Sequence, residues 1–509
     1  MTVALIRHSF ALVTLAGACL FAVPAFAAQD HCHDLAGYDG EGVTIVSARS
    51  QAARPAAGDK PAVASHCLIE GVATRVEGSR IGFQVRLPQR QDWTRRLRMY
   101  GNGGYSSAMP VEALEDAVSM GYVAVATDTG HMGDDPAFAI GRPASIDDWA
   151  WRAVHESVAA AKGIAQEYYG DAPKFSYFLG CSTGGHQALM EAQRFPQDFD
   201  GIVAGAPGNN RTRLNLGFLW QFMSTHDRSG ALTFAPAKLR LLTRHALKSC
   251  GSADEQAAGF LLDPLSCRPD PAALQCAAGG EGAADCLTAG EVVSARAMYA
   301  GAHTKDGQQI YPPWLPGSES VGPPNFPLPG WSLYWADPQR PDRPARESFF
   351  RFWAFPTQSW RWQDFDFDTA LENLDALSAR IDAIDPDLSA FHASGGRLLQ
   401  FHGMADPVVS PWDSVAYHRS VVAEMGARTD DFYRLFMVPG MAHCAGGPGY
   451  GSLETDTAIE RWVEQGQAPD HLTATRSTPR GDDKLPVSLQ LKPWDGRISL
   501  APIEKRPTS

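Results

Sequence analysis

Beyond its first residues the sequence has no long apolar run, no long basic run and no internal repeat. A membrane-spanning helix needs about 20 consecutive apolar residues, so we do not expect a transmembrane domain. The formal net charge is −13, which makes nucleic acid and anionic membrane surfaces poor partner candidates. Hydrophobic residues make up 44% of the 509 residues, which is enough for a large folded core.

The one apolar segment of some length lies near the N-terminus. Arg7 precedes it, and Ala25-Phe26-Ala27 follows it. This order of positive charge, apolar run and small residues is typical of a secretory signal peptide. We therefore expect residues 1–27 to be removed before Ala28, leaving a secreted or periplasmic chain with no membrane association. A lipoprotein anchored through Cys19 is the alternative.

The cysteines form no C-x-x-C pair and no clustered histidine-cysteine spacing, so the sequence does not predict a zinc site. An even number of cysteines in an exported chain suggests four disulfides, although the spacing leaves their connectivity open. Apart from Cys19, eight of the nine cysteines remain: Cys32, Cys67, Cys181, Cys250, Cys267, Cys276, Cys286 and Cys444.

Short apolar runs alternate with helical patterns in two parts of the chain. The expected strands are Phe83–Leu87, Leu97–Tyr100, Tyr122–Thr127, Phe175–Leu179, Gly201–Gly205, Arg397–His402 and Tyr433–Val438. The expected helices are Val111–Met120, Trp149–Tyr169 and His186–Phe195. Such alternation predicts the α/β class, with a parallel sheet covered by helices on both faces.

The alternation stops over residues 213–395, which are rich in Pro, Gly, Trp and Phe and contain four cysteines. We expect an inserted lid domain there, dividing the core into residues 28–212 and 396–509. In open α/β sheets ligands bind beyond the carboxyl ends of the strands. An insert at that edge would cover the site.

The segment Gly180-Cys181-Ser182-Thr183-Gly184 matches G-x-S-x-G between an expected strand and an expected helix. That context is the one a nucleophile elbow requires, because the tight turn exposes the serine hydroxyl. Ser182 is therefore the candidate nucleophile. The alternative is a glycine-rich turn in which the serine only caps the helix.

A serine hydroxyl needs a base, and the base needs an acid to orient it. Asp406 follows the expected strand 397–402, and His443 follows the expected strand 433–438. The order Ser182, Asp406, His443 is that of α/β-hydrolases. Asp413 and His402 are the nearby rival candidates.

The oxyanion of the reaction would need backbone donors from two places. The amide of Thr183, directly after the nucleophile, is one candidate. Gly103 and Gly104, in a glycine-rich loop after an early strand, are candidates for the other. Asp128 and His131 lie after another strand, and we expect them to hold loops near the site by hydrogen bonds.

These residues resemble the tannase and feruloyl esterase family, which includes mono(2-hydroxyethyl) terephthalate hydrolase. Cys181 directly precedes the candidate nucleophile and Cys444 directly follows the candidate base, a pairing similar to that of the family. The likeness extends over nearly all of the mature chain. Further similar stretches are Gly101–Tyr105, Thr127–His131, Asp200–Pro207 and Pro439–Met441.

The resemblance implies an α/β-hydrolase core with a lid inserted between nucleophile and acid. It also implies a disulfide that ties the elbow to the histidine loop, which would keep the base close to the nucleophile. The implied disulfides are Cys32–Cys67, Cys181–Cys444, Cys250–Cys267 and Cys276–Cys286.

Family lids often bind calcium through spaced carboxylates shortly after a cysteine. In the matching stretch of this sequence, Asp254 is the single candidate ligand, and Gly251 and Ala258 stand where carboxylates are expected. Calcium takes about six to eight oxygen ligands. We therefore predict that the calcium site is lost or badly weakened and that the enzyme needs no cofactor.

The resemblance implies a small-molecule ester of an aromatic acid as substrate, of the feruloyl (hydroxycinnamoyl) or galloyl type, or an ester such as mono(2-hydroxyethyl) terephthalate. Aromatic lid residues suit a flat acyl group: Tyr334, Trp335, Phe349, Phe350, Phe352, Trp353, Phe355, Trp360 and Trp362. Arg346, Arg351 and Arg361 are each candidates to meet a substrate carboxylate.

A peptidase or lipase on the same fold and a non-catalytic binding protein are the rival hypotheses. The oligomeric state is not readable from the sequence.

Overall fold

The computed structural model describes residues 31–278, 284–322, 330–356, 359–477, 484–497 and 500–501. The expected signal peptide, residues 1–27, and the alternative lipid attachment at Cys19 lie outside these ranges. Within them, no helix has the length and apolar character that crossing a membrane requires.

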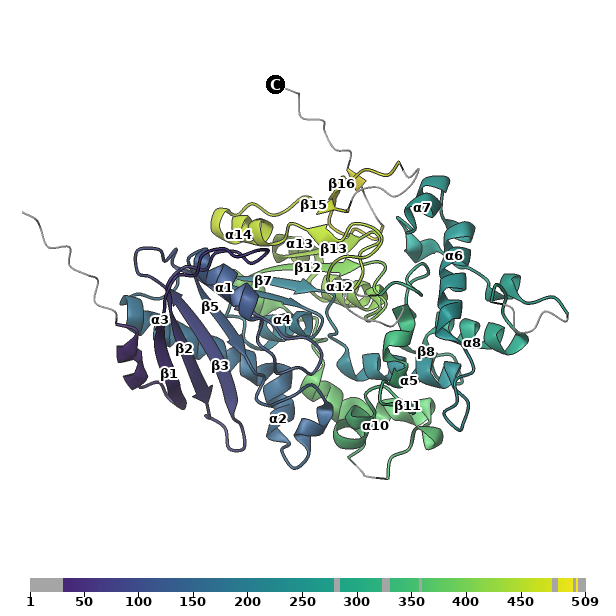
Figure 1. The fold of residues 1–509 in the computed structure, drawn as a ribbon, viewed down its shortest axis with the longest axis horizontal. Coiled ribbons are helices and arrows are strands. Elements are labelled where there is room, and N and C mark those ends of the chain that lie inside the picture. Colours follow the sequence, from purple (N-terminus) through teal and green to yellow (C-terminus); the bar gives the residue numbers. More distant parts are fainter. Residues whose placement is uncertain are drawn as a thin grey trace, which may run out of the picture.

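A nine-stranded sheet forms the centre of the molecule, in the order β1-β2-β3-β5-β4-β6-β7-β12-β13 (Figure 1). Its strands are β1 (Val43–Gln51), β2 (His66–Ala73), β3 (Ile81–Pro88), β4 (Arg96–Tyr100), β5 (Tyr122–Thr127), β6 (Phe175–Cys181), β7 (Gly201–Gly205), β12 (Arg397–Gly403) and β13 (Tyr433–Val438). From β5 to β13 all neighbours are parallel.

The expectation of a parallel sheet is wrong for one edge. Strands β1, β2 and β3 pair antiparallel with their neighbours, and β3 pairs antiparallel with β5. Parallel neighbours need a long crossover, whereas a short connection can only reverse the chain. A short link joins β2 to β3, so the chain turns back on itself there.

Helices cover both faces of the sheet. Helices α1 (Val111–Ser119) and α14 (Asp456–Gln465) pack on one face, in the apolar cluster that contains Leu114 and Trp462. Helices α3 (Ala153–Tyr169), α4 (Thr183–Arg194) and α12 (Pro411–Met425) belong to the cluster of the other face. Strand β5 supplies both clusters, because alternate side chains of a strand point to opposite faces. The expected α/β-hydrolase class is confirmed.

A second group of helices lies to one side of the sheet (Figure 1). It comes from the chain between β7 and β12 and packs around a second apolar cluster that contains Leu219, Trp331 and Phe350. Its longer helices are α5 (Arg211–Thr225), α6 (Leu239–Cys250), α8 (Ala289–Ala300) and α10 (Phe367–Ile381). The described part of this segment adds no strand to the nine-stranded sheet.

The two ends of the segment are held together beside the sheet. The amide of Ala383 donates to the Asn209 carbonyl (2.8 Å), and Asp382 accepts from the amide of Thr212 (2.9 Å). Phe391, further along, already packs with the core helices. The insert boundaries at residues 213 and 395 stay predictions, while these contacts mark where the segment leaves and rejoins the core.

Shorter elements complete the fold. The remaining helices are α2 (Ala144–Asp147), α7 (Ala253–Ala258), α9 (Glu347–Phe349), α11 (Ser389–Ala393) and α13 (Thr429–Phe432). Two hairpins are formed by β8 (Ala302–His303) with β9 (Gln309–Tyr311) and by β10 (Ala336–Asp337) with β11 (Arg340–Pro344). A small C-terminal sheet comprises β14 (Ser452–Leu453), β15 (Leu472–Thr475), β16 (Ser488–Leu491) and β17 (Leu500–Ala501).

Glu191, on α4, is fully buried in the core. Burial raises the pKa of its carboxyl well above the usual range, and the negative charge of Asp198 raises it further. The folded state therefore holds this proton more tightly than the unfolded chain. Stability accordingly falls as pH rises from the usual glutamate pKa towards the raised folded value.

We expect Glu191→Gln to remove this loss, because a glutamine carries no titrating proton. Relative to the wild type, the free energy of unfolding of the variant should rise by up to about 1.4 kcal/mol per pH unit within that window. Denaturant unfolding between about pH 4.5 and 8 measures this difference. The control is Glu424→Gln on the exposed side of α12. Parallel stability profiles for Glu191→Gln and the wild type would contradict the expectation.

Candidate active site

Ser182 occupies a strained turn between β6 and α4. Its backbone has φ 63° and ψ −119°, a combination that costs a non-glycine residue about 1–3 kcal/mol. The flanking glycines allow the turn to close. A Cβ on Gly180 would lie 2.2 Å from the Gly184 carbonyl oxygen, and one on Gly185 would lie 2.4 Å from the Gly205 carbonyl oxygen. The strand, tight turn and helix expected around the motif are all present.

Hydrogen bonds from β7 and α4 hold this turn. The Ser182 amide donates to the Gly205 carbonyl (3.0 Å), and the Ser182 carbonyl accepts from the amides of His186 (3.0 Å) and Gly208 (3.1 Å). The conformation is therefore fixed by the surrounding backbone, as a strained functional residue requires.

Asp406 and His443 meet at the carboxyl ends of two neighbouring strands. Strands β12 and β13 are parallel and in register up to Gly403 opposite Val438, so the loops after them adjoin. His443 Nδ1 lies 2.7 Å from Asp406 Oδ2. The structure thus brings together the predicted acid and base.

The Asp406 carboxylate is fully buried yet ionised. Burial alone would raise its pKa, but the attraction of His443 and the hydrogen bonds from His402 and His443 hold that pKa well below its usual range. The other carboxylate oxygen accepts from the amides of Val408 (2.7 Å) and Val409 (3.0 Å). An ionised Asp406 makes Nδ1 of His443 a donor and leaves Nε2 free to accept a proton.

His402, a rival candidate by sequence, is instead a contact of Asp406. Its Nε2 lies 3.2 Å from Asp406 Oδ2, and its Nδ1 lies 2.7 Å from the Ser414 hydroxyl. Gln400 Nε2 donates to the same hydroxyl (2.7 Å), so the Ser414 proton points to Nδ1 and Nε2 carries the ring proton. That proton is shared between Asp406 and the Val409 carbonyl oxygen, which lies 3.1 Å from Nε2. The other rival, Asp413, lies on α12 with no hydrogen bond or ion pair to His443 in the described structure.

The structure contains the four disulfides that the resemblance implied: Cys32–Cys67, Cys181–Cys444, Cys250–Cys267 and Cys276–Cys286. In the Cys181–Cys444 bridge the Cα atoms are 5.8 Å apart. Because Ser182 follows one of these cysteines and His443 precedes the other, the bridge ties the serine turn to the histidine loop.

The predicted oxyanion donors lie on two adjoining segments. Thr183 is the first residue of α4, where no earlier carbonyl of the helix can accept its amide hydrogen. Within the described chain, the amides of Gly103 and Gly104 also form no hydrogen bond, and Gly104 has φ 55°. The Thr183 hydroxyl donates to the Gly104 carbonyl (2.8 Å), which joins the two segments.

Asp128 and His131 hold loops near this site, as expected. Asp128 Oδ1 accepts from the amides of Gly82 and Gly130, both at 2.8 Å. His131 Nε2 lies 2.7 Å from the Tyr105 carbonyl oxygen, next to the glycine loop. Burial lowers the pKa of His131, so the ring is neutral and Nε2 is the donor.

The structure separates the three candidate arginines of the insert. Arg361 lies 3.5 Å from Asp364 on the surface, and Arg351 lies over the Phe352 ring. Arg346 borders the glycine loop, because a Cβ on Gly104 would lie 3.5 Å from its Nη2.

Arg346 contacts an aromatic ring and a backbone carbonyl. Its guanidinium lies 5.2 Å from the Tyr105 ring centroid, and its backbone has φ 60°. Glu347, the next residue, pairs with Arg340 and Arg343 (3.2 Å each). Arg346 Nη1 donates to the Asp134 carbonyl (3.1 Å), and no ion pair of the described residues includes Arg346.

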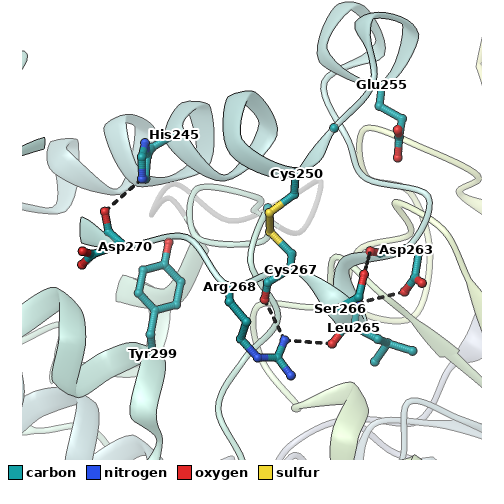
Figure 2. Close-up of a disulfide and its surroundings, with 12 residues drawn as sticks. His245, Cys250, Glu255, Asp263, Leu265, Ser266, Cys267, Arg268, Asp270 and Tyr299 are labelled. Atoms are coloured by element: carbon teal, nitrogen blue, oxygen red, sulfur yellow. Dashed lines mark hydrogen bonds between the residues drawn. A yellow bond between two sulfur atoms is a disulfide. The ribbon is translucent and has the colours of Figure 1, made fainter. Parts of the chain in front are cut away.

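Figure 2 shows the loop after α6, where the resemblance places a calcium site. The Cys250–Cys267 disulfide closes this loop. Arg268 Nη1 donates to the carbonyls of Leu265 (2.8 Å) and Cys267 (2.7 Å), as the dashed lines show. The Arg268 guanidinium therefore binds two backbone carbonyl oxygens of this loop.

The residues present do not fit a calcium site. Glu255 accepts from the amides of Ser252 (2.8 Å) and Leu262 (2.7 Å), so its carboxylate caps α7 and braces the loop. In the described part of the chain no three acidic, histidine or cysteine side chains are arranged to hold a metal, and Asp254 belongs to no such group. That the enzyme needs no calcium stays a prediction.

A model of the tannase and feruloyl esterase family matches residues 67–495. The chain belongs to this family. It is a carboxylic ester hydrolase, like the relatives that it matches over most of its length. An uncharacterized esterase of Xanthomonas campestris pv. campestris is 33% identical over 460 residues, covering 82% of this chain and 78% of that protein. Feruloyl esterase B of Aspergillus niger is 29% identical over 423 residues, covering 79% and 78%.

Solved structures agree with this assignment. Feruloyl esterase B from Aspergillus oryzae has a TM-score of 0.79 at 27% identity, over 92% of this chain and 96% of that one. Tannin acyl hydrolase from Aspergillus niger has a TM-score of 0.70 at 19% identity, over 91% and 92%, and shows the shared fold. The esterase thus has the family fold over nearly its full length.

Proposed function

We propose that this chain is a secreted or periplasmic serine esterase that hydrolyses esters of aromatic acids through an acyl-enzyme. The observation that carries the proposal is the buried Asp406–His443 pair, tied by the Cys181–Cys444 disulfide to the strained turn of Ser182. The four disulfides support an oxidising compartment.

In the proposed mechanism, Ser182 Oγ attacks the ester carbonyl while His443 Nε2 accepts its proton. The Thr183 amide and an amide of Gly103 or Gly104 donate to the oxyanion, each worth about 3 kcal/mol in the transition state. His443 then protonates the leaving alcohol. Water attacks the acyl-enzyme in the same way and frees the acid, with Asp406 ionised throughout.

The acyl group is proposed to be feruloyl, another hydroxycinnamoyl group or galloyl, because the family is that of tannases and feruloyl esterases and relatives are named feruloyl esterase B. Among the aromatic residues of the insert, Trp335, Phe349 and Trp353 are buried in its own apolar cluster. The partly exposed ones are better candidates to contact a substrate ring: Tyr334, Phe352, Phe355 and Trp360.

A second candidate substrate is an aromatic ester that also bears a carboxylate, such as mono(2-hydroxyethyl) terephthalate. Arg346 favours it, because its guanidinium has no carboxylate partner among the described residues and borders the glycine loop. A planar guanidinium can bind a carboxylate through two parallel hydrogen bonds.

Hydrolysis by the purified mature chain tests these proposals. The substrates are methyl ferulate, methyl gallate, mono(2-hydroxyethyl) terephthalate and p-nitrophenyl acetate, each assayed with the wild type, Ser182→Ala and Arg346→Met. We expect an aromatic ester to be hydrolysed and the activity to vanish in Ser182→Ala. Preference for the terephthalate ester, lost selectively in Arg346→Met, would favour the second candidate.

Other results would overturn the assignment. Serine-dependent activity on the acetate alone would leave a serine esterase but contradict an aromatic acyl group. If every ester is left intact, the chain is better explained as a binding protein on a hydrolase fold or as a peptidase.

A further inference from the structure

Arg211 is a buried cation beside the candidate oxyanion hole. It is the first residue of α5, the helix that leads from the core into the insert, and it is 5% exposed. Its Nη2 donates to the Thr183 hydroxyl (2.7 Å), and its Nε has no hydrogen-bond partner among the described residues. No ion pair in the described chain includes Arg211. A buried, unpaired charge of this kind costs stability and calls for a functional reason.

The Arg211 guanidinium contacts aromatic rings where an ion pair with a carboxylate would be expected. The Arg211 guanidinium carbon lies 5.7 Å from the Tyr105 ring centroid and 5.3 Å from the Trp149 ring centroid. Such contacts attract a cation but neutralise no charge. Asp382 attracts Arg211 without forming an ion pair with it, and its carboxylate accepts hydrogen bonds from Thr212 and Ser378. Among the described residues, the positive charge therefore has no direct ion-pair partner.

The direction of the hydrogen bonds follows from the chemistry of the groups. A guanidinium can only donate, so the Thr183 hydroxyl must accept from Arg211. The single hydroxyl proton is then available to the Gly104 carbonyl, 2.8 Å away. Trp149 Nε1 also donates to that carbonyl, at 3.3 Å. Two consecutive hydrogen bonds thus run from Arg211 to Thr183 and from Thr183 to Gly104.

These two hydrogen bonds join three separate segments of the protein. Arg211 is the first residue of α5, Thr183 the first residue of α4, and Gly104 lies in the loop after β4. The amides proposed to bind the oxyanion belong to the last two segments. A donor contributes to catalysis only if it is aimed at the oxyanion before the charge develops. Fixing the Gly104 carbonyl fixes the orientation of the peptide that contains it and so restrains the loop.

We propose that Arg211 is a positioning residue of the oxyanion hole. Through the Thr183 hydroxyl it holds the glycine loop against the start of α4, and its charge favours negative charge developing nearby. The inference rests on the proposed function. It also links the oxyanion hole to α5, the helix that leads from the core into the insert.

The test compares Arg211→Met and Thr183→Val with Thr183→Ser, which keeps the hydroxyl, and with Arg240→Met, an exposed arginine of the insert. Hydrolysis of the best aromatic ester is measured per titrated active site. We expect kcat to fall about 10- to 100-fold in Arg211→Met and Thr183→Val, with KM changed less than about threefold. Thr183→Ser should recover most of the kcat that Thr183→Val loses, and Arg240→Met should stay within about threefold of the wild type.

Stability separates a positioning role from a structural one. Since the unpaired charge opposes folding, Arg211→Met should keep or raise the melting temperature while it lowers kcat. A lowered melting temperature with a normal kcat per site would overturn the proposal. If Arg211→Met fails to fold, Thr183→Val still tests the proposal. A normal kcat in Thr183→Val would show that the hydrogen bonds of the Thr183 hydroxyl are not needed for catalysis.

A second readout keeps this inference distinct from the proposed function. Phosphonylation by a p-nitrophenyl phosphonate requires the nucleophile and the oxyanion hole but no turnover, and mass spectrometry follows it. We expect it to slow in Arg211→Met and Thr183→Val and to recover in Thr183→Ser. Wild-type labelling that both variants leave unchanged would refute the inference. Absence of ester hydrolysis by the wild type would refute the proposed function instead.

Discussion

Asp406→Asn is expected to lower kcat about 10³- to 10⁴-fold on the aromatic ester that the wild type hydrolyses best. The ionised carboxylate accepts from His443 Nδ1 at 2.7 Å and so leaves Nε2 as the base. An asparagine amide can donate to Nδ1 and stabilise the wrong tautomer, and it removes the charge that stabilises the imidazolium. KM should change little, because Asp406 is buried and out of contact with solvent.

Asp413→Asn is the matched control for this prediction. Asp413 is also a buried aspartate, seven residues further along, and burial together with the charge of Asp382 raises its pKa to about 7. Since it does not contact His443, its replacement should leave kcat within about threefold. Initial rates per titrated active site measure both variants. Equal losses in the two variants, or an active Asp406→Asn, would contradict the assignment of the acid.

Removing the disulfide next to the nucleophile is expected to damage both stability and activity. The Cys181–Cys444 bridge closes a loop of 263 residues, for which chain entropy predicts about 5.6 kcal/mol of stabilisation. The variant Cys181→Ala/Cys444→Ala should therefore unfold at a much lower denaturant concentration. Its kcat per folded molecule should also fall at least about tenfold, because a small misplacement of the base is costly.

Cys276→Ala/Cys286→Ala is the control for the effect on activity. That bridge spans 10 residues of the insert, and the same model predicts about 3 kcal/mol of stabilisation. It joins two residues of the insert, neither of which is next in sequence to a candidate catalytic residue, so kcat per folded molecule should not change. Guanidinium unfolding and active-site titration measure both variants. An unchanged kcat per folded molecule in the first variant would show that the bridge serves stability alone.

Local patterns predicted much of the parallel core. Strands β5, β7 and β13 begin and end where their apolar runs do, because a strand buried on both faces needs an unbroken run. Helix α4 begins at Thr183, earlier than the expected His186, because the elbow turns directly into the helix. The antiparallel edge was not predicted, since the direction of a strand depends on its connections and leaves no mark in its own residues.

The candidate catalytic residues were predictable because their residue types occur in the expected order after the expected strands. Residues that reach the site only through contacts between distant segments were not predictable. Ser182 is marked by its glycines, and Asp406 and His443 by the strands before them. His402 lies four residues before Asp406, a spacing that offered a signal, but its position at a strand end favoured a structural interpretation. Arg211 meets Thr183 across 28 residues of sequence, and no local pattern predicts that contact.

Covalent labelling by a fluorophosphonate, with mapping of the labelled peptide by mass spectrometry, tests the serine mechanism most directly. We expect one adduct per molecule on Ser182, loss of ester hydrolysis in proportion to labelling, and no adduct in Ser182→Ala. Labelling of Asp406→Asn should be much slower than that of the wild type. An adduct on another residue, or full hydrolysis by a chain whose Ser182 is blocked, would contradict the serine mechanism.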